Sequence, residues 1–463
     1  MKMTLAICIF LMAVWVTPAS AQKDKKGGLD IPDGLKALKN PNPQVRYNSA
    51  ELLLRLGPVA KFAIPALQEA LKDENARVRM KVAEALWTIE RPPARELLPV
   101  LIVGLKEKDA AVRIDALVVL RQMGKTAKPA IPAIARSLND KDMEVRLEAV
   151  VALGEMGAAA RETVPALLDA LQGDELRLLE VAVAATLGNI GAPAVPTLVK
   201  TLPDKDAARR RTAAYALALI GPPAAEAVPA LTEALRDTES DVRALAARAL
   251  GAVGQQAKGS ATALATALKD SDPVVRVHAA LALWQADGRS EGLSELRAAL
   301  KAKDDRVREQ ACLALGEFGA KAQAAAPALL EVALRDGAVR VRMLGAEALG
   351  KIGLGKDAAA RFAAALKDED EGVRLSAARA LWDTASVEKR KELVMVVSEG
   401  LRSKAASVRK RAAEVLGRFG AAAQEAVPAL LEALREPDPT VRQAAAAALR
   451  QIDPTAAAKA GVR

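Results

Sequence analysis

The stretch DMEVRLEAVVALGEMG at residues 142–157 decides the fold, because phrases of the same form return along the whole chain, as in SDVRALAARALGAVG at 240–254. The arginine of the Val-Arg pair defines thirteen sites between residues 46 and 442, with a mean spacing of 33 residues. Only the fifth site, Glu180, is not arginine, and leucine stands seven residues after every site. A fixed period of this length is the signature of a repeat architecture.

Each copy of the phrase predicts a long helix that packs against its neighbours. The valine before the arginine and the leucine eight residues later lie about two turns apart on one helical face. Alanines three and four residues after the arginine allow close helix packing. The pattern Gly-x-hydrophobic-Gly, as at Gly154 and Gly157, then ends the helix, with the second glycine as a left-handed C-cap. A shorter helix with proline in its first turn, such as Pro165, lies between successive copies.

These patterns predict an all-α fold, an α-solenoid (superhelix) of about 13 helical hairpin repeats of about 33 residues. A hairpin of this size cannot bury its apolar stripe alone, but stacked neighbours form a continuous core. We expect one continuous array over residues 31–453, with disordered segments at 22–30 and 454–463.

Residues 1–21 have the layout of a cleavable signal peptide. Lys2 precedes an apolar run at 5–16, and the small residues Ala19 and Ala21 precede the expected cleavage site. The run is shorter than a bilayer span, and no later segment is long and apolar enough to replace it. We therefore expect a soluble, exported protein, periplasmic or secreted. Cleavage would leave Cys312 as the one cysteine, with no intramolecular disulfide, and we expect a buried thiol rather than a reactive one.

The repeated residues resemble HEAT repeats of the short variety also called PBS-lyase HEAT-like repeats, from residue 31 to about 452. The resemblance rests on the Pro-Ala-Leu helix, the Asp-x-x-x-Val-Arg turn and the Ala-Ala-x-Ala-Leu-Gly helix. It implies that the proline helices lie on the convex side of the solenoid and the Val-Arg helices on the concave side. It also implies that aspartates and arginines of successive repeats pair into a ladder. Aspartate stands four residues before the arginine site at Asp109, Asp142, Asp206, Asp272, Asp304, Asp370 and Asp438. The arginines assigned to the ladder are Arg79, Arg113, Arg146, Arg243, Arg276, Arg308, Arg374 and Arg442.

Two departures from the pattern carry expectations of their own. Glu180 replaces the arginine in the fifth copy, where we expect a break in the ladder and a local change of curvature. Trp87, Trp284 and Trp382 replace the first glycine in three copies that also lose the second. We expect each ring to fill the looser end of a helix pair, with a ligand platform as the alternative.

The chain offers few residues for catalysis or metal binding. His278 is its one histidine, and with Cys312 it is too small a set of soft ligands for an ordinary transition-metal site. Deoxyhypusine hydroxylase, an enzyme built from similar repeats, uses His-Glu pairs that this chain lacks. Bilin lyases act on cytoplasmic pigment proteins, which the expected export argues against. We expect no enzyme and no cofactor.

The geometry of a solenoid favours a non-catalytic scaffold that binds an unidentified protein along its concave face. The net charge of +10 is spread among interleaved charges and aromatic residues are few, so no specific nucleic acid is expected. We expect a monomer. The candidate partner-binding residues lie one, two or five positions after an arginine site, or belong to a basic set in the twelfth copy: Tyr47, Tyr215, Arg248, His278, Gln310, Arg379, Arg409, Lys410 and Arg411.

Two alternatives remain open. Residues 386–418 carry nine basic and four acidic side chains, so the C-terminal repeats could form a basic groove for an acidic polymer or acidic protein. An enzyme or enzyme subunit related to bilin lyases or deoxyhypusine hydroxylase is the other alternative.

Overall fold

The computed structural model describes residues 35–171 and 176–462, and all regular secondary structure in these ranges is helical. The all-α prediction is confirmed for this part of the chain. Its thirteen long helices match the thirteen copies of the Val-Arg phrase, and shorter helices and 3-10 turns connect them. The expected signal peptide at 1–21 and the expected disordered segment at 22–30 lie outside the described residues. The described residues divide into two compact units, unit 1 up to residue 260 and unit 2 from residue 261.

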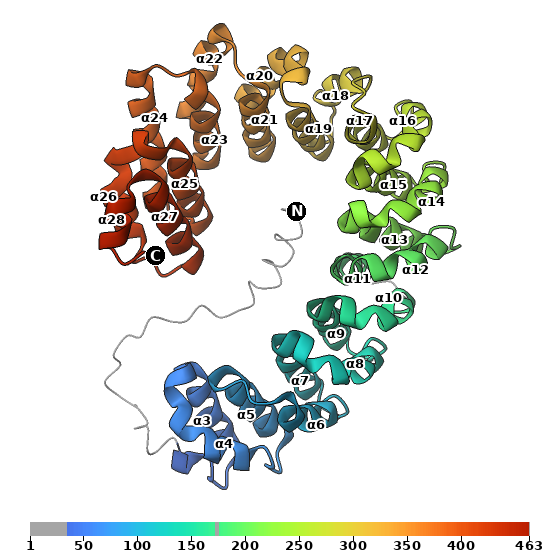
Figure 1. Cartoon of the computed structure of the whole chain (residues 1–463), viewed down its shortest axis with the longest axis vertical. Helices are drawn as coiled ribbons and strands as arrows, with labels where there is room; N and C mark the ends of the chain where they lie inside the picture. Colours follow the sequence, from blue (N-terminus) through green and yellow to red (C-terminus); the bar gives the residue numbers. More distant parts are fainter. Residues whose placement is uncertain (1–34, 172–175, 463) are drawn as a thin grey trace. The chain divides into compact units, whose positions relative to one another are not determined.

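Unit 1 alternates long and short helices, which form two layers (Figure 1). Its long helices are α3 (Pro43–Leu56), α5 (Ala76–Ile89), α7 (Ala110–Met123), α9 (Met143–Met156), α11 (Leu176–Ile190), α13 (Ala207–Ile220) and α15 (Ser240–Val253). Its short helices are α4 (Ile64–Ala70), α6 (Ala94–Gly104), α8 (Ile131–Ser137), α10 (Val164–Asp169), α12 (Val195–Thr201) and α14 (Val228–Ala234). The 3-10 segments are η1 (Gly57–Ala63), η2 (Gly124–Ala130), η3 (Gly157–Thr163), η4 (Ala192–Ala194), η5 (Pro222–Ala227) and η6 (Gly254–Ser260).

Unit 2 repeats this alternation. Its long helices are α17 (Pro273–Asp287), α19 (Asp305–Phe318), α21 (Val339–Ile352), α23 (Glu371–Leu381), α25 (Ala406–Phe419) and α27 (Pro439–Ile452). Its shorter helices are α16 (Ala261–Ala267), α18 (Leu293–Ala299), α20 (Ala326–Arg335), α22 (Lys356–Phe362), α24 (Val387–Glu399), α26 (Val427–Ala433) and α28 (Pro454–Lys459). The 3-10 segments are η7 (Gly319–Ala325), η8 (Ala363–Lys367), η9 (Trp382–Thr384), η10 (Gly400–Arg402) and η11 (Gly420–Ala426).

The start of most long helices is fixed by a side-chain cap four residues before the arginine site. The Asp142 carboxylate accepts hydrogen bonds from the backbone N–H groups of Glu144 and Val145. These N–H groups have no partner inside the helix, so a capping carboxylate stabilises its first turn. The other N-caps of this kind are Asn42, Asn75, Asp109, Asp206, Asp272, Asp304, Asp370 and Asp438.

The second glycine of the phrase ends the long helix in a conformation that differs from the prediction. Gly157 has the expected positive φ of 56°, but its ψ of −136° lies far from the left-handed helical region. Only glycine enters this part of the map readily, because a Cβ would clash with the backbone. The chain then turns directly into the 3-10 segment η3, which delivers it to the short helix. A simple left-handed C-cap is therefore wrong for this copy, although the requirement for glycine stands.

The leucine seven residues after each arginine site fills the core between the two layers. All thirteen, from Leu53 to Leu449, are at most 4% exposed. In unit 2 the buried side chains from Val277 to Ala457 form one hydrophobic cluster that passes from copy to copy. The copies of unit 2 therefore share one core, as the stacking argument requires.

The first glycine of the phrase lets neighbouring long helices approach closely. A Cβ added to Gly350 of α21 would lie 3.1 Å from the Ala380 Cα of α23. A Cβ added to Gly154 of α9 would lie 2.9 Å from the Thr186 Oγ1 of α11. At these two crossings glycine is therefore a packing requirement.

The disorder predicted for 454–463 is wrong for residues 454–462, which the structure describes. Pro454–Lys459 form helix α28, which the Asp453 carboxylate caps at the Ala456 backbone N–H. Ala457 is buried against the last copy. The Asp-Pro-Thr sequence is a helix-start signal, since proline suits the first helical position and aspartate the cap.

In the described ranges, no single helix has the length and hydropathy of a membrane span. The segments 177–190 and 192–201 reach them only as a pair bent by 113°.

Candidate functional site

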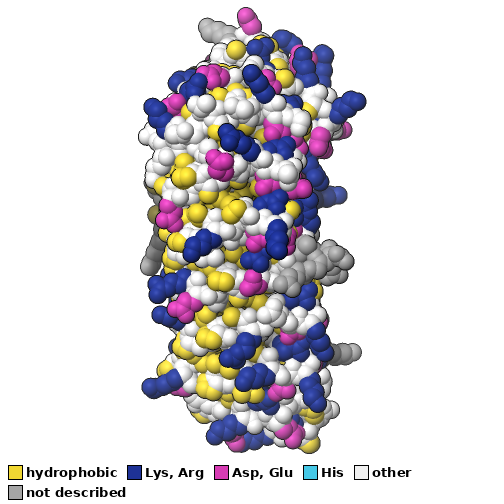
Figure 2. Space-filling model, turned by 90° about the vertical axis from the view of Figure 1, so that its right-hand side faces the viewer, with side chains coloured by type: hydrophobic (Ala, Val, Ile, Leu, Met, Phe, Trp, Pro, Cys, Tyr) yellow, Lys and Arg dark blue, Asp and Glu magenta, His cyan; other side chains and the backbone are white. Residues whose placement is uncertain are grey.

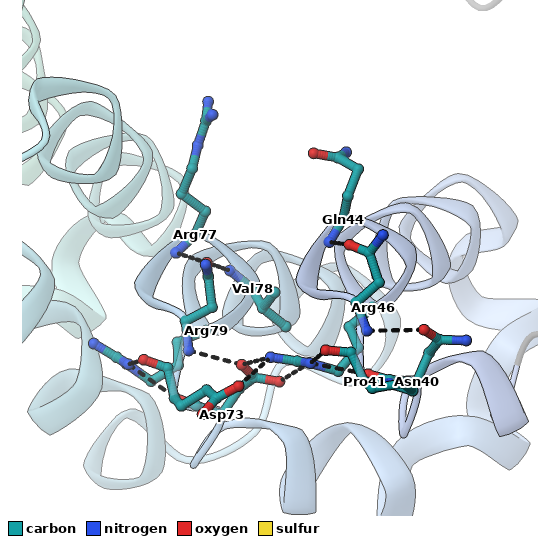
Figure 3. Close-up of polar contacts among 11 residues, drawn as sticks. Asn40, Pro41, Gln44, Arg46, Asp73, Arg77, Val78 and Arg79 are labelled. Atoms are coloured by element: carbon teal, nitrogen blue, oxygen red, sulfur yellow. Dashed lines mark hydrogen bonds and ion pairs between the residues drawn. The ribbon is translucent and has the colours of Figure 1, made fainter.

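The repeated arginine first ties its own copy together. Arg79 Nη1 donates hydrogen bonds to the backbone carbonyls of Asp73 at 2.8 Å and Glu74 at 3.0 Å (Figure 3). The same bond, from Nη1 to the carbonyl six residues earlier, occurs at all twelve arginine sites. The guanidinium therefore pins the turn that precedes the long helix.

The rest of the guanidinium reaches the next copy. Arg46 Nε and Nη2 donate to the two carboxylate oxygens of Asp73 at 2.6 and 2.8 Å (Figure 3). Since the Asp73 carbonyl accepts from Arg79, one aspartate links two successive arginines. Four further pairs have this bidentate form: Arg113–Asp140, Arg210–Asp237, Arg308–Asp336 and Arg342–Asp368. Such fork-to-fork pairs are the strongest geometry for arginine and carboxylate.

The ladder uses aspartates other than those suggested by the sequence. Its carboxylates stand six residues before an arginine site, where the short helix has just ended. The aspartates four residues before the site, such as Asp109 and Asp142, cap the long helices instead. The assignment of these aspartates to the ladder is therefore wrong, because their carboxylates are held by the first-turn N–H groups of their own helix.

The predicted ladder arginines divide into several groups. Arg113 and Arg308 make bidentate pairs, and Arg79 reaches Glu107 at 2.8 Å. Arg276 lies 3.6 Å from Glu295, and Arg374 lies 3.8 Å from Glu371 of its own helix. Arg146, Arg243 and Arg442 bond the turn carbonyls of their own copies.

Four arginines outside the predicted set also belong to the ladder. They are Arg46, Arg210, Arg342 and Arg409, the last through Glu436 at 3.0 Å.

The ladder carboxylates have shifted acidities. Burial alone would raise the pKa of Asp336, but hydrogen bonds from Arg308 and from the Ala338 N–H outweigh it and hold the pKa below its usual value. The pKa values of Asp73, Asp140 and Asp237 are lowered for the same combination of reasons. These aspartates therefore stay ionised under mildly acidic conditions.

In the fifth copy a glutamate stands at the arginine site, and it forms an ion pair with an arginine of the next copy. Glu180 is 6% exposed and accepts hydrogen bonds from Arg211 Nε at 2.9 Å and Nη2 at 2.6 Å. Arg211 belongs to the next long helix, α13. The sequence correctly predicts that the arginine ladder is interrupted here, but it gives no sign of the compensating pair.

Two of the candidate tyrosines lie under cations from the next copy. Lys81 Nζ lies 5.5 Å from the centre of the Tyr47 ring, and the Arg248 guanidinium lies 5.2 Å from that of Tyr215. Tyr215 and Arg248, both predicted site residues, are thus brought together on neighbouring long helices. Lys81 also pairs with Glu51 at 3.1 Å and Glu84 at 2.7 Å, which makes this part of the surface a charged network.

The remaining candidates are dispersed over unit 2. His278 on α17 and Gln310 on α19 are half-buried. Arg409 serves the ladder, and Lys410 lies 3.9 Å from Glu414 of its own helix. Arg411 donates to Glu347, two copies away, and to Ser376 Oγ at 2.8 Å. Of the predicted basic set, internal partners thus engage all three members.

Two of the three tryptophans that replace glycine, Trp284 and Trp382, stack on aromatic rings of the next copy. Trp284 lies 4.8 Å from Phe318, and Trp382 lies 3.6 Å from Phe419 with nearly parallel rings. Each phenylalanine occupies the hydrophobic position of a Gly-x-Phe-Gly phrase. This stacking supports the expectation that these rings fill space between helices.

A pocket of 250 Å³ opens among three long helices of unit 2. Its walls come from α21, α23 and α25 and from η9, and they include the predicted residue Arg379 together with Arg418, which was not in the predicted set. Both arginines are exposed. The sequence offered one signal for this pair: Arg379 stands five residues after the arginine site of its copy, and Arg418 stands nine residues after that of the next copy.

Side chains suited to chemistry are sparse in the described ranges. Burial raises the pKa of the Cys312 thiol to about 12, which suppresses its thiolate. Within residues 35–171 and 176–462, no three histidine, cysteine, aspartate or glutamate residues are grouped so that they could hold a metal ion.

Comparison with known proteins places the chain. The family model for HEAT repeats matches residues 31–98, 98–185, 164–251, 261–350 and 394–460. No similar sequence was found among proteins of curated function.

Two solved structures of importin-β agree on the fold. Yeast importin-β is 15% identical over 92% of this chain and 67% of its own, with a TM-score of 0.60. Importin-β crystallised in an ammonium sulfate condition is 15% identical over 91% of this chain and 67% of its own, with a TM-score of 0.51. The chain spans 53% of a karyopherin bound to the C-terminus of the phosphatase Cdc14p, at 16% identity and a TM-score of 0.40. At these identities the likeness concerns the fold alone, and this fold is a HEAT-repeat α-solenoid. The chain, matched over most of its length, belongs to the HEAT-repeat family.

Proposed function

We propose that this protein is a non-catalytic, exported scaffold that binds a protein partner along the surface of its long helices. The observation that carries the proposal is a contrast between positions. Seven residues after the arginine site every copy has a buried leucine, whereas five residues after it the side chain changes from copy to copy. Examples of the variable position are Glu84, Val151, Tyr215, Leu313 and Arg379.

This contrast separates packing from recognition. The side chains at the invariant positions form the core and the ladder, so their contacts are made inside the protein. The variable positions are half-buried or exposed, so the fold places little constraint on them. A row of individually chosen side chains on a regular scaffold is how repeat proteins form extended binding surfaces. Within the family, the short PBS-lyase type is the proposed subtype, supported by the spacing of 33 residues and the Pro-Ala-Leu helix.

The side chains that catalysis most often uses are few in this chain, and we propose a binding role rather than an enzymatic one. Cys312 is buried with a raised pKa, and the chain has the single histidine His278. The His-Glu pairs of deoxyhypusine hydroxylase do not occur in the sequence. An enzyme related to the bilin lyases would copurify with a pigment, so a coloured preparation would overturn the non-catalytic assignment.

The polymer-binding alternative receives little support. Arg409, Arg411 and Lys389 of the basic C-terminal copies pair with Glu436, Glu347 and Glu392. A groove that binds a polyanion needs a continuous track of unpaired cations. A different face, the right-hand side of Figure 1 that Figure 2 draws, also has basic and acidic side chains intermixed, with hydrophobic side chains between them.

Site-specific photo-crosslinking tests the scaffold proposal. A photoreactive amino acid is placed at Leu313 or Gln310 on a long helix, or at Arg297 on the short helix α18 as a matched control. The full chain is expressed in cells of its source and irradiated. We expect one adduct protein from the long-helix positions and none from Arg297. Adducts from Arg297 alone would contradict the proposed surface.

Export and oligomeric state are tested on the same preparation. We expect an N-terminus at Gln22 in protein recovered outside the cytoplasm, and a monomeric mass in solution. An intact Met1 terminus in the cytoplasmic fraction would contradict export.

A further inference from the structure

The pocket on α21, α23 and α25 has an unusual charge balance. Its charged lining consists of Lys351, Arg379 and Arg418 with Glu347 and Asp383. Lys351 pairs with Glu317 at 2.8 Å, and Glu347 is held by Arg411 from outside the lining. Two guanidiniums are therefore left against the single carboxylate of Asp383.

Arg379 and Arg418 differ in their ion pairing from most of the cations around them. Among the described residues, neither guanidinium has a carboxylate within ion-pairing distance. Of the other cations nearby, Lys351, Lys410 and Arg411 have an acidic partner, while Arg390 donates to the Trp382 carbonyl and lies over its ring. Partial burial and the nearby Arg418 charge lower the pKa of Arg379.

The pocket is held in shape by contacts that do not involve these two arginines. Arg411 reaches across the eleventh copy to Glu347 and donates to Ser376 Oγ at 2.8 Å, which ties three successive copies together. Trp382 stacks on Phe419 at 3.6 Å and forms an apolar wall. A site whose shape is fixed before binding loses less entropy when its ligand arrives.

We infer that this pocket binds a carboxylate of an acidic segment in a protein partner, between the guanidiniums of Arg379 and Arg418. Arginine recognises carboxylates through two parallel N–H···O bonds, and the apolar wall suits the methylene groups of a glutamate side chain. An extended polyanion fits less well, because the flanking cations Arg409 and Lys410 already have acidic neighbours. The inference rests on the proposed scaffold function and adds the chemistry of the partner.

Peptide binding by the full chain tests the inference. The probe is a fluorescein-labelled decapeptide of alternating glutamate and serine, and the same peptide with glutamine is the ligand control. The test protein is Arg379→Gln/Arg418→Gln. The control is Arg297→Gln/Arg435→Gln, which removes two exposed charges of unit 2 outside the pocket. Circular dichroism confirms that each variant is folded, and the single variant Arg418→Gln serves if the double variant is not.

We expect the wild type and the Arg297/Arg435 control to bind the glutamate peptide equally, at least tenfold tighter than the pocket variant. Equal binding by the pocket variant, or no binding by the wild type at millimolar peptide, would overturn the inference. Pocket-dependent binding of heparin without binding of the peptide would assign the site to a polyanion and overturn it as well. If the crosslinks from Leu313 persist in any of these cases, the scaffold function stands and only the pocket assignment fails.

Discussion

Arg342 is a single side chain that joins two successive copies of the array. It donates to the Asp336 carbonyl in its own copy and to both carboxylate oxygens of Asp368 in the next. Its side chain is 8% exposed, so a carboxylate left without it would be poorly hydrated. Removing one partner of a buried ion pair is costly for this reason, even where the pair itself adds little net stability.

Arg342→Gln should lower the free energy of unfolding by roughly 3 kcal/mol, the scale for breaking a buried pair. Arg374→Gln is the matched control, because Arg374 bonds its own turn carbonyls and meets only Glu371 at 3.8 Å. Its loss should be about 1 kcal/mol. Urea denaturation followed by circular dichroism measures both, and equal losses would contradict the role given to Asp368.

At Glu180, a substitution toward the repeat consensus should destabilise the fold. Glu180→Arg restores the arginine of the other copies but places it against Arg211, so we expect a loss of at least about 3 kcal/mol. The charge swap Glu180→Arg/Arg211→Glu should recover part of the loss. Thermal denaturation of the two variants measures the difference, and a stabilised Glu180→Arg protein would refute the pairing.

The ladder aspartates predict a loss of stability in acid. A carboxylate whose pKa is lower in the folded state than in the unfolded state, as for Asp336, stabilises the fold fully above its unfolded pKa of about 3.9. That contribution disappears as the pH falls through the folded pKa. Burial is the main reason that the pKa values of Asp115 and Glu148 are raised. Protonation of these two carboxylates in acid therefore favours the folded state.

We expect the urea midpoint to fall between about pH 5 and pH 2, because lowered aspartates outnumber raised carboxylates. Asp336→Asn should be less stable than the wild type at pH 7, and the gap should close as the pH falls. A gap that stays constant across this range would show that the Arg308–Asp336 pair does not titrate as argued.

At the scale of helices, the distance between neighbouring long helices is set by the residue eight positions after the arginine. Where this residue is Gly350, the backbone of α23 lies so close that a Cβ at this position would be 3.1 Å from the Ala380 Cα. Where it is Trp382, a ring fills the space and stacks on Phe419. The same position therefore either permits close contact or fills a wider gap, which is a packing choice made copy by copy.

Gly350→Ala should destabilise the fold by about 1–3 kcal/mol, the usual cost of an added methyl group in a filled site. The control is Gly337→Ala, in the exposed turn before α21, where a Cβ would meet nothing within 4 Å. It should be neutral within about 0.5 kcal/mol. Denaturation midpoints distinguish the two, and equal effects would mean that α21 and α23 can move apart without cost.

At the scale of the whole molecule, the contacts between copies reach only a short way along the array. The ladder pairs and the stacked rings join successive copies, and pairs such as Arg411–Glu347 extend two copies along. Stability in such an array is a sum of copy and interface terms, so local damage should stay local.

Hydrogen exchange of Arg342→Gln tests this locality. Amide protection should fall in α19, α21, α23 and α25, while α5 and α7 of unit 1 keep wild-type rates. Uniform loss of protection along the chain would indicate one cooperative unit instead.

Particular residues show how far the sequence could lead. The thirteen leucines and the interruption at Glu180 were readable because helical periodicity is local and repeats itself. The ladder partner was misassigned because Asp140 and Asp142 both precede Arg146, and only the folded chain shows which carboxylate faces Arg113. The tail at 454–459 was misjudged because it lies beyond the last copy of the repeat, although Asp453 and Pro454 form a helix-start signal.

The sequence by itself determined the helices, their period and their buried faces, since these depend on contacts within one hairpin and its copy next door. Only the tertiary structure decided the pocket of Arg379 and Arg418, because its walls come from three copies whose surface positions vary independently. Core positions repeat because every hairpin faces the same packing problem. Surface positions meet no such common constraint, so which of them come together depends on how the copies stack.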